Sequence, residues 1–535
     1  QRLCLFATIL LTLCCLFSCA PAVQSPAPAG KLTIIGTGDL QGRLDADPRS
    51  ISITESSEKI EIVGGISRIA GLIRQIQRET PNPVIVVSSG DDLMGRYFHQ
   101  FDGKAIFSLM EMSGYEVMAL GNHEFDRGPG VLAEALDSVN FTVLCSNLEV
   151  QDTVMGKSCR SYLLLDYQGI RIGFFSLMTN DFPVVTVTGK VKIRNTQAEV
   201  ARNMIRTLKG KGAQVIVAVT HIGTYMDRIL VAEVAGIDII FGGHSHNYMN
   251  RLERVNNTLI VNGGEKGSAL VRLDISLDEK NQVIPTSAAY SLIPVTEDIE
   301  LDAKVEKLLA EYRNQLPAAT VVGMTEKEWD LTRVTLCSCE SNVANLITDM
   351  IRSQFKVDVV LYNGGAFRGN SKFSPGPVTD TMLAEIDAFE NNVYLMTMQG
   401  KYIRQILEHS ATLIGQGGFL QGSGITFTID TKEQPQKLTH KDRTNYAISR
   451  PGKKIKNIRI QSPDGSWQPL DPKRNYRLAS NDFLVKLAGD HYFWFKKYGQ
   501  GIHNTYSTMG TIITDYFRKH TIVNPEGPDG RITIR

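Results

Sequence analysis

The chain has almost no surplus of either charge. Its 57 Lys and Arg residues nearly balance its 56 Asp and Glu residues, which leaves a formal net charge of +1. It also lacks a basic stripe with interleaved aromatic residues. Binding to a nucleic-acid polymer, or electrostatic attraction to a strongly acidic partner, is therefore not predicted. No internal repeat or low-complexity tract stands out, and at 535 residues the chain is expected to form two globular domains.

No hydrophobic run is long enough to cross a bilayer comfortably. The run from Leu3 to Phe17 follows Arg2 and is typical of a secretory signal peptide. The letters LFSC, which end at Cys19, resemble a bacterial lipobox, in which that cysteine is the lipidated first residue of the mature protein. We therefore predict a signal peptide over residues 1–19 and a flexible linker over 20–30. The same pattern predicts a bacterial protein outside the cytoplasm, periplasmic or at the cell surface, that contacts a membrane only through a lipid anchor.

Cysteine is scarce beyond this segment. The remaining four residues are Cys145, Cys159, Cys337 and Cys339, and none of them forms a C-x-x-C pair, so a zinc ribbon is not favoured. In an oxidising compartment Cys145 and Cys159 are candidates for a disulfide. Cys337 and Cys339 are poorly placed to bridge each other, because they lie only two positions apart.

Strand-like and helix-like patterns alternate along most of the chain. Over residues 31–297, short apolar runs such as PVIVV and QVIVAV are separated by amphipathic stretches, which is typical of a layered α/β domain. An amphipathic helix within residues 298–318, ending at Pro317, is interpreted as the connector between domains. A second α/β domain is predicted over residues 319–535.

Polar side chains directly follow the apolar runs of the first domain. They are Asp39, Gln41, Asp91, Asn122, His123, Asp126, His221, His244 and His246. Each one alone is readily explained as a turn or capping residue. In open α/β sheets, however, the carboxyl ends of the strands gather at one edge. Carboxylate, amide and imidazole groups converging there suit a site for two divalent metal ions.

The order of these motifs resembles a known family. GDLQG, GDD, GNHEFD, THIG and GGHSH are similar to the motifs of calcineurin-like binuclear metallophosphoesterases. Further along, ESNVANLITDM, YNGGAFRG, GGFLQGSGI and NDFLVKLAGD resemble the C-terminal domain of the 5′-nucleotidase family, which includes ecto-5′-nucleotidases and bacterial UDP-sugar hydrolases. The resemblance implies an αββα-type phosphoesterase domain followed by a smaller α/β substrate-binding domain. It also implies a metal-dependent phosphohydrolase that releases phosphate from nucleoside 5′-phosphates by in-line attack of metal-bound hydroxide.

Carried over motif by motif, the resemblance assigns roles in the first domain. One ion, zinc, manganese or similar, would be held by Asp39, Gln41, Asp91 and His246. The other would be held by Asp91, Asn122, His221 and His244, with Asp91 bridging the two ions. His123 would stabilise or protonate the leaving group, and Asp126 would orient His123.

In the second domain the resemblance implies a pocket for a nucleotide. Phe419 and Phe483 would sandwich the base, and aromatic faces of this kind bind bases with little discrimination. Asn363 and Arg368 would contact base and phosphate, and Asp490 the ribose hydroxyls.

The chain departs from the family pattern in three places. Gln41 stands where the family usually has histidine, and an amide oxygen suits harder cations than imidazole does. Gln41 either ligates weakly or turns away, and in both cases we expect the first ion to be lost more readily than the second. The family's usual arginine before the E-x-N motif is missing, with Arg333 the nearest, and His491 follows Asp490.

Other functions stay open on this evidence. The same fold would suit hydrolysis of 2′,3′-cyclic nucleotides, nucleotide sugars or a sulfur-linked ester. An alternative of another class is a surface lipoprotein that binds nucleosides and has lost catalysis, although the retained His123 and His221 argue against it. The sequence does not indicate an oligomeric state.

Overall fold

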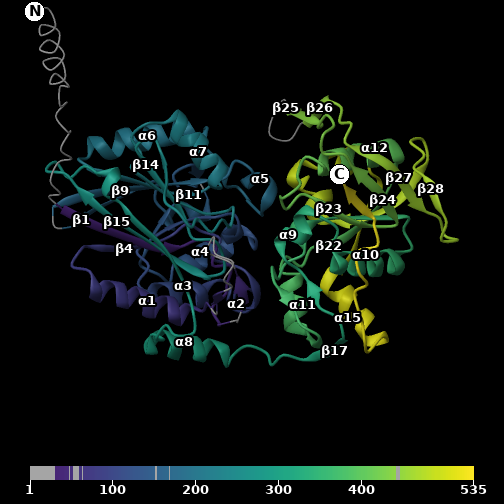
Figure 1. The fold of residues 1–535 in the computed structure, drawn as a ribbon, viewed down its shortest axis with the longest axis horizontal. Coiled ribbons are helices and arrows are strands. Elements are labelled where there is room, and N and C mark those ends of the chain that lie inside the picture. Colours follow the sequence, from purple (N-terminus) through teal and green to yellow (C-terminus); the bar gives the residue numbers. More distant parts are fainter. Residues whose placement is uncertain are drawn as a thin grey trace, which may run out of the picture.

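The computed structural model describes two α/β domains, which lie beside each other in Figure 1. The residues described are 30–46, 49–51, 60–62, 64–150, 153–167, 169–440 and 446–535. The predicted signal peptide, with all but the last residue of the predicted linker, lies outside the described residues. Within those ranges, no helix has both the length and the apolar character needed to cross a membrane.

The first domain is built on two six-stranded sheets that pack face to face. The first sheet has the order β16 (Ala289–Pro294), β15 (Ala269–Leu277), β1 (Gly30–Thr37), β4 (Val84–Ser88), β5 (Val117–Ala119) and β6 (Thr142–Leu144). The second has the order β13 (Glu253–Val255), β14 (Thr258–Asn262), β12 (Ile239–Gly242), β11 (Val215–His221), β9 (Ile170–Met178) and β8 (Leu163–Tyr167). One core cluster joins their inner faces, with Ile34 and Val87 from the first sheet and Val217 and Phe241 from the second fully buried. The near-continuous β-branched runs of the sequence reflect burial on both faces.

Helices cover the outer face of each sheet. One side carries α1 (Ile66–Glu79), α2 (Gly95–Phe101), α3 (Lys104–Ser113) and α4 (Gly128–Leu136). The other side carries α6 (Gln197–Gly210) and α7 (Thr224–Glu233). The result is the predicted four-layered αββα arrangement, which Figure 1 shows with α1 and α6 on opposite sides of the strands.

The helix predicted as a connector packs against the first domain. It is α8 (Ala303–Arg313), whose Asp302 side chain accepts hydrogen bonds from the Lys304 and Val305 N–H groups as its N-cap. Val305 and Leu309 are buried in the core that α1 and α3 also form. The chain then runs to β17 (Val321–Thr325) in the second domain (Figure 1).

The second domain is centred on a five-stranded sheet. Its order is β23 (Leu420–Ser423), β19 (Val359–Asn363), β29 (Asn475–Asn481), β22 (Asn392–Gln399) and β30 (Gln500–Thr508). One face packs on α10 (Asn342–Phe355) and α15 (Met509–Lys519). The other packs on α12 (Gly400–Ser410), α14 (Phe493–Tyr498) and a sheet of β28 (Trp467–Pro469), β27 (Ile455–Gln461), β24 (Ile425–Ile429) and β31 (Ile532–Ile534).

The cysteines of the described chain fall into two kinds. Cys145 and Cys159 form a disulfide, with their Cα atoms 5.9 Å apart. Cys337 is buried and Cys339 exposed, and both are free thiols.

Candidate metal centre

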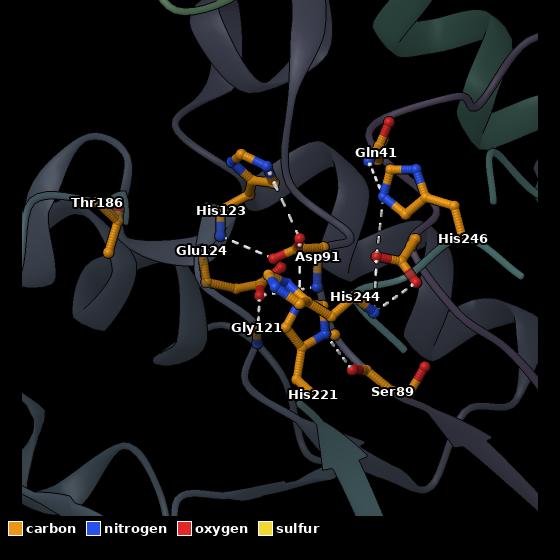
Figure 2. Close-up of polar contacts among 12 residues, drawn as sticks. Gln41, Ser89, Asp91, Gly121, His123, Glu124, Thr186, His221, His244 and His246 are labelled. Carbon is orange, nitrogen blue, oxygen red and sulfur yellow. Dashed lines mark hydrogen bonds and ion pairs between the residues drawn. The ribbon is translucent and has the colours of Figure 1, made fainter. Parts of the chain in front are cut away.

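The polar residues that follow the strands of the first domain meet at one edge. β1 and β4 are parallel neighbours in one sheet, and β11 and β12 are parallel neighbours in the other. Their carboxyl ends therefore lie together. Figure 2 shows Asp91, His221 and His244 close to one another, with Gln41 and His246 beside them.

One half of the site is formed by Asp91, His221 and His244. Asp91 Oδ2 lies 3.0 Å from His221 Nε2, which in turn lies 3.2 Å from His244 Nδ1. One ligand atom from each of the three residues falls within 4.8 Å of the others. His221 Nδ1 lies 2.8 Å from the Ser89 carbonyl oxygen. This bond requires a proton on Nδ1, so in the neutral ring the Nε2 lone pair points to the centre of the cluster.

These side chains fit a divalent cation. Within the described structure, the buried Asn122 Oδ1 has no hydrogen-bond partner, although buried polar atoms rarely stay unpaired. Burial lowers the pKa of His221, but the adjacent Asp91 carboxylate outweighs this and raises the pKa to about 10. Burial and the neighbouring His221 lower the pKa of His244 to about 3, so the Asp91 carboxylate favours positive charge on one of the two converging rings only. Imidazole, carboxylate and amide oxygen are also a donor set that such ions accept.

The other half of the site contains Asp39, Gln41 and His246. His246 Nε2 lies 3.4 Å from Asp39 Oδ1 and 3.1 Å from Gln41 Nε2. The Gln41 carbonyl oxygen faces away and accepts a hydrogen bond of 3.1 Å from Arg368 of the second domain. Ligation through that oxygen would require the amide to turn over, which would break the contact with Arg368.

Several of these residues have a strained backbone. Asp39, Gln41, Asp91, His244 and His246 all have positive φ values, between 51° and 73°. Residues other than glycine rarely adopt this conformation, and they keep it only where the surrounding structure imposes it. Such strain clusters at functional sites, and here it marks five of the seven residues that the resemblance assigns as ligands.

Glu124 is a residue whose role the sequence did not reveal. Its buried carboxylate accepts hydrogen bonds from the Asp91, Asp92, Leu93 and Gly121 N–H groups, at 2.7 to 3.2 Å. It therefore fixes the loop after β4 against the loop after β5. A Cβ on Gly121 would lie 2.3 Å from Asp91 Oδ1, so only glycine fits there. The GNHE motif contains both residues, but their contacts are not readable from it.

The role of Glu265 was also not predicted from the sequence. Its Oε2 lies 2.9 Å from His246 Nδ1, and its Oε1 accepts a hydrogen bond from Asn370 of the second domain. Carboxylates that bind the far nitrogen of a histidine orient the ring toward a metal. Glu265 has no sequence signal of its own, because its partners are far away along the chain.

His123 is positioned next to the cluster but outside it. Its Nδ1 lies 2.7 Å from Asp126 Oδ2, and its backbone N–H donates to Asp91 Oδ1 at 2.7 Å. Asp126 is held in turn by the Thr186 hydroxyl at 3.0 Å. Burial lowers the pKa of His123, but Asp91 and Asp126 outweigh it and raise the pKa above its usual value. The ring is therefore prepared to carry a proton.

A cavity of about 1090 Å³ lies between the two domains. The first domain contributes Asn122, His123 and Asp126 to its lining, and the second domain contributes Asn363, Arg368, Phe483 and Asp490. Asn363 Nδ2 lies 3.5 Å from Asp490 Oδ2, while Asn363 Oδ1 accepts from Asn481 at 2.9 Å. Arg333 lines the same cavity, so a cation is present although the usual sequence position lacks one. His491 Nε2 lies 3.6 Å from Asp181 Oδ1 of the first domain.

Phe419 is not where the prediction placed it. Its side chain is 0% exposed, in the core cluster that contains α12 and β23, and it does not line the cavity. Gly415, Gln416 and Gly417 form that part of the wall instead. The physical reason is that a large apolar ring next to a core strand is stabilised more by burial than by a polar cavity. Phe389, which the sequence analysis did not single out, lines the cavity together with Phe483.

Comparison with known proteins agrees with this geometry. Residues 32–248 match the family model for calcineurin-like phosphoesterases, and residues 321–497 match that for the 5′-nucleotidase C-terminal domain. A solved 5′-nucleotidase precursor from Thermus thermophilus superimposes with a TM-score of 0.82 at 26% identity, covering 94% of this chain and 99% of that one.

Two curated relatives extend the comparison. The 5′-nucleotidase of Bos taurus is 26% identical over 94% of this chain and 90% of its own length. The trifunctional nucleotide phosphoesterase protein YfkN of Bacillus subtilis (strain 168) is 29% identical over 80% of this chain, which spans only 31% of that larger protein. Fold and site together define a metal-dependent phosphohydrolase with a second domain beside its metal centre. The chain belongs to the 5′-nucleotidase family of metallophosphoesterases.

Proposed function

We propose that the protein hydrolyses nucleoside 5′-phosphates to nucleosides and phosphate. The supporting observation is the cavity between the domains, which His123 lines on one side and Phe483 and Asp490 line on the other. A phosphate at the metal centre and a nucleoside on the second domain would then belong to one molecule. Small-molecule sites of roughly 300–1,000 Å³ are usual, so the cavity has room for a nucleotide.

The metal ligands follow the two halves of the site. Asp91, Asn122, His221 and His244 would hold one divalent ion, and Asp39, Asp91, His246 and Gln41 the other. Ions held there supply neutralisation of the phosphoryl charge and an activated water. Gln41 is the weakest of these donors, because its carbonyl oxygen is directed to Arg368.

Side chains of the protein would donate the proton to the leaving group and bind the substrate. His123 would donate a proton to the departing 5′ oxygen, and Asp126 holds its ring by the far nitrogen. Arg368 would contact the phosphate, since it lines the cavity next to Gln41. On the second domain Phe483 would stack on the base, with Asp490 near the ribose.

The cavity volume also favours a second candidate substrate. About 1090 Å³ is at the upper end of the range of roughly 300–1,000 Å³ that is usual for small-molecule sites. A nucleotide sugar, which carries a further phosphate and a sugar, would also fit a cavity of this size.

Export and lipid anchoring at Cys19 form a second part of the proposal. The disulfide between Cys145 and Cys159 supports it, since such bonds persist in oxidising compartments. Mass spectrometry of the mature N-terminus should find a diacylglyceryl group on Cys19, and Cys19→Ser should release the protein from membranes. A mature protein that keeps residues 1–19, or an unmodified Cys19, would refute it.

One experiment tests the activity. Purified protein is assayed for phosphate release from AMP, other mononucleotides, 2′,3′-cyclic nucleotides and UDP-sugars, each with Zn²⁺, Mn²⁺ or Co²⁺. Release from 5′-mononucleotides with the highest kcat/KM supports the proposal. Preference for cyclic or sugar nucleotides would reassign the substrate, and binding without any hydrolysis would indicate an inactive nucleoside-binding protein.

A further inference from the structure

We propose that Phe389 is a positioning residue that holds the His123 and Arg368 side chains in their working arrangement. The proposal rests on the proposed function, because it concerns the leaving group and the phosphate of the same substrate. Phe389 lies between α11 (Asp380–Ile386) and β22, on the second domain. His123 belongs to the first domain, so the contact crosses the domain interface.

The aromatic ring of Phe389 contacts both polar side chains. Its centroid lies 5.3 Å from that of the His123 ring, and the two planes are inclined by only 28°. The Arg368 guanidinium carbon lies 5.4 Å from the centroid of the same Phe389 ring. The face of an aromatic ring is negative and attracts cations, so the Arg368 guanidinium is stabilised beside it, and the nearly parallel His123 ring stacks on it.

The loop that carries Phe389 is anchored on both sides of the interface. On its own domain, the buried Asp387 carboxylate accepts a hydrogen bond of 2.7 Å from the Gly510 N–H at the start of α15. On the other side, His99 Nε2 of α2 lies 3.1 Å from the Ala388 carbonyl oxygen. Glu390, the next residue, has a φ of 49°, which turns the chain sharply after the ring. Phe389 is thus held in one place by contacts from both domains.

The Phe389 ring sets the inclination of the His123 imidazole. Asp126 binds His123 at Nδ1, and Asp91 Oδ2 lies 3.7 Å from Nε2, which is beyond hydrogen-bond distance. Neither of these contacts sets the inclination of the imidazole ring about its long axis. Stacking on Phe389 sets that inclination, and hence the direction of Nε2. The Arg368 guanidinium donates to Gln41 at one end and lies over Phe389, so the same ring restrains the phosphate-binding group.

Leaving-group chemistry distinguishes this role from a merely structural one. Departure of the alkoxide of AMP requires proton donation, whereas p-nitrophenolate leaves without it. Phe389→Leu should therefore lower kcat for AMP by roughly 10–100-fold, since small misplacements of catalytic groups cost this much. For p-nitrophenyl phosphate it should lower kcat by less than about threefold, because p-nitrophenolate leaves without a proton donor. Loosening of Arg368, which would contact the phosphate of both substrates, should instead raise KM for both of them.

Two comparisons make the experiment specific. His123→Ala should show the same selectivity for AMP, at ~10²–10⁴-fold. Adding Phe389→Leu to His123→Ala should then cause little further loss of kcat with AMP, because on kcat the two residues act through one proton transfer. A rise in KM from the loosened Arg368 is expected with or without His123. The matched control is Phe355→Leu, the same change at a partly buried ring that does not line the cavity, and it should leave kcat for both substrates unchanged.

The outcomes decide the proposal. Equal losses of kcat with both substrates, or fully additive effects of Phe389→Leu and His123→Ala on kcat with AMP, would overturn it. Phe389→Tyr, which keeps the ring, should retain most of the AMP activity, and a loss as large as that of Phe389→Leu would also overturn it. If wild-type protein releases phosphate from p-nitrophenyl phosphate and glycerol 2-phosphate but from no nucleotide, the proposed substrate fails. The alkyl and aryl esters then still test Phe389.

Discussion

The two halves of the metal centre differ in what holds their donor atoms. Around His221, the hydrogen bonds and ion pairs found among the described residues come from the first domain: Ser89 binds Nδ1 of the ring, and Asp91 lies against Nε2. In the half that contains His246, the second domain takes part. Asn370 binds Glu265, which in turn pairs with His246 Nδ1. Arg368 meanwhile binds the carbonyl oxygen of Gln41.

The partners that orient His221 therefore belong to the first domain, whereas those that orient His246 and Gln41 include residues across the domain interface. Partners that orient a ligand change metal affinity by about 10–100-fold when they are removed. Interface contacts near Gln41 and Glu265 should therefore set how tightly the second half holds its ion. The substrate-binding domain would then adjust the metal centre as well as bind the nucleotide.

Removal of Asp91 should abolish ion binding in both halves of the metal centre, because this carboxylate is assigned as a ligand of both ions. Asp91→Ala is expected to lose both ions and to lower kcat/KM by roughly a thousandfold or more, since the Lewis-acid contribution amounts to several kcal/mol. Elemental analysis after dialysis and phosphate-release kinetics measure both effects. A folded variant that keeps two ions would contradict the assignment.

Asn370→Ala should increase the difference in ion affinity between the halves, because it removes the hydrogen bond from the second domain to Glu265, which contacts only one half. We expect the affinity for the more weakly held ion to fall by about 10–100-fold while the other ion stays bound. Titration calorimetry on metal-free protein resolves the two sites. The control is Asn140→Ala, an exposed asparagine of the first domain that binds Glu111. Equal weakening of both sites would show that the halves are not organised separately.

Gln41→His should reduce the difference in zinc affinity between the halves, and we expect it to have the smallest effect of the three substitutions. An imidazole would not need the carbonyl contact to Arg368, and it is a better donor for zinc. We expect zinc at this half to bind about tenfold more tightly, roughly 1.4 kcal/mol. Limited chelation of the wild-type protein should remove one ion before the other. If the wild-type protein and Gln41→His both bind two zinc ions equally tightly, Gln41 does not weaken its half of the metal centre.

The sequence predicted the architecture of both domains and the edge of the sheet where the polar residues meet. Alternating apolar runs indicate layers, and the carboxyl ends of parallel strands must lie together, so local patterns were sufficient for Asp91, His221 and His244. The helix before Pro317 was predicted as well, although its packing on α1 and α3 was not. Amphipathic spacing marks which face of a helix is buried but not which domain buries it.

The sequence could not predict whether a side chain of the second domain points into the cavity or into the core. Phe419 and Phe483 both lie in motifs of the second domain, yet only Phe483 lines the cavity, while Phe419 enters the core. The choice depends on which neighbouring elements leave room for a ring, and those elements are distant along the chain.

Local periodicity and strand direction in the sequence were enough for a layered α/β architecture, for the type of donor groups and for their gathering at one sheet edge, whereas the αββα order followed from the family resemblance. Tertiary structure alone decided that Phe389 stacks on His123 across the interface. It also decided that Glu124 binds four backbone N–H groups, and that Gln41 directs its carbonyl oxygen to Arg368. Each of these contacts joins segments whose proximity arises only when the sheets and the two domains have packed, so no local pattern can encode it.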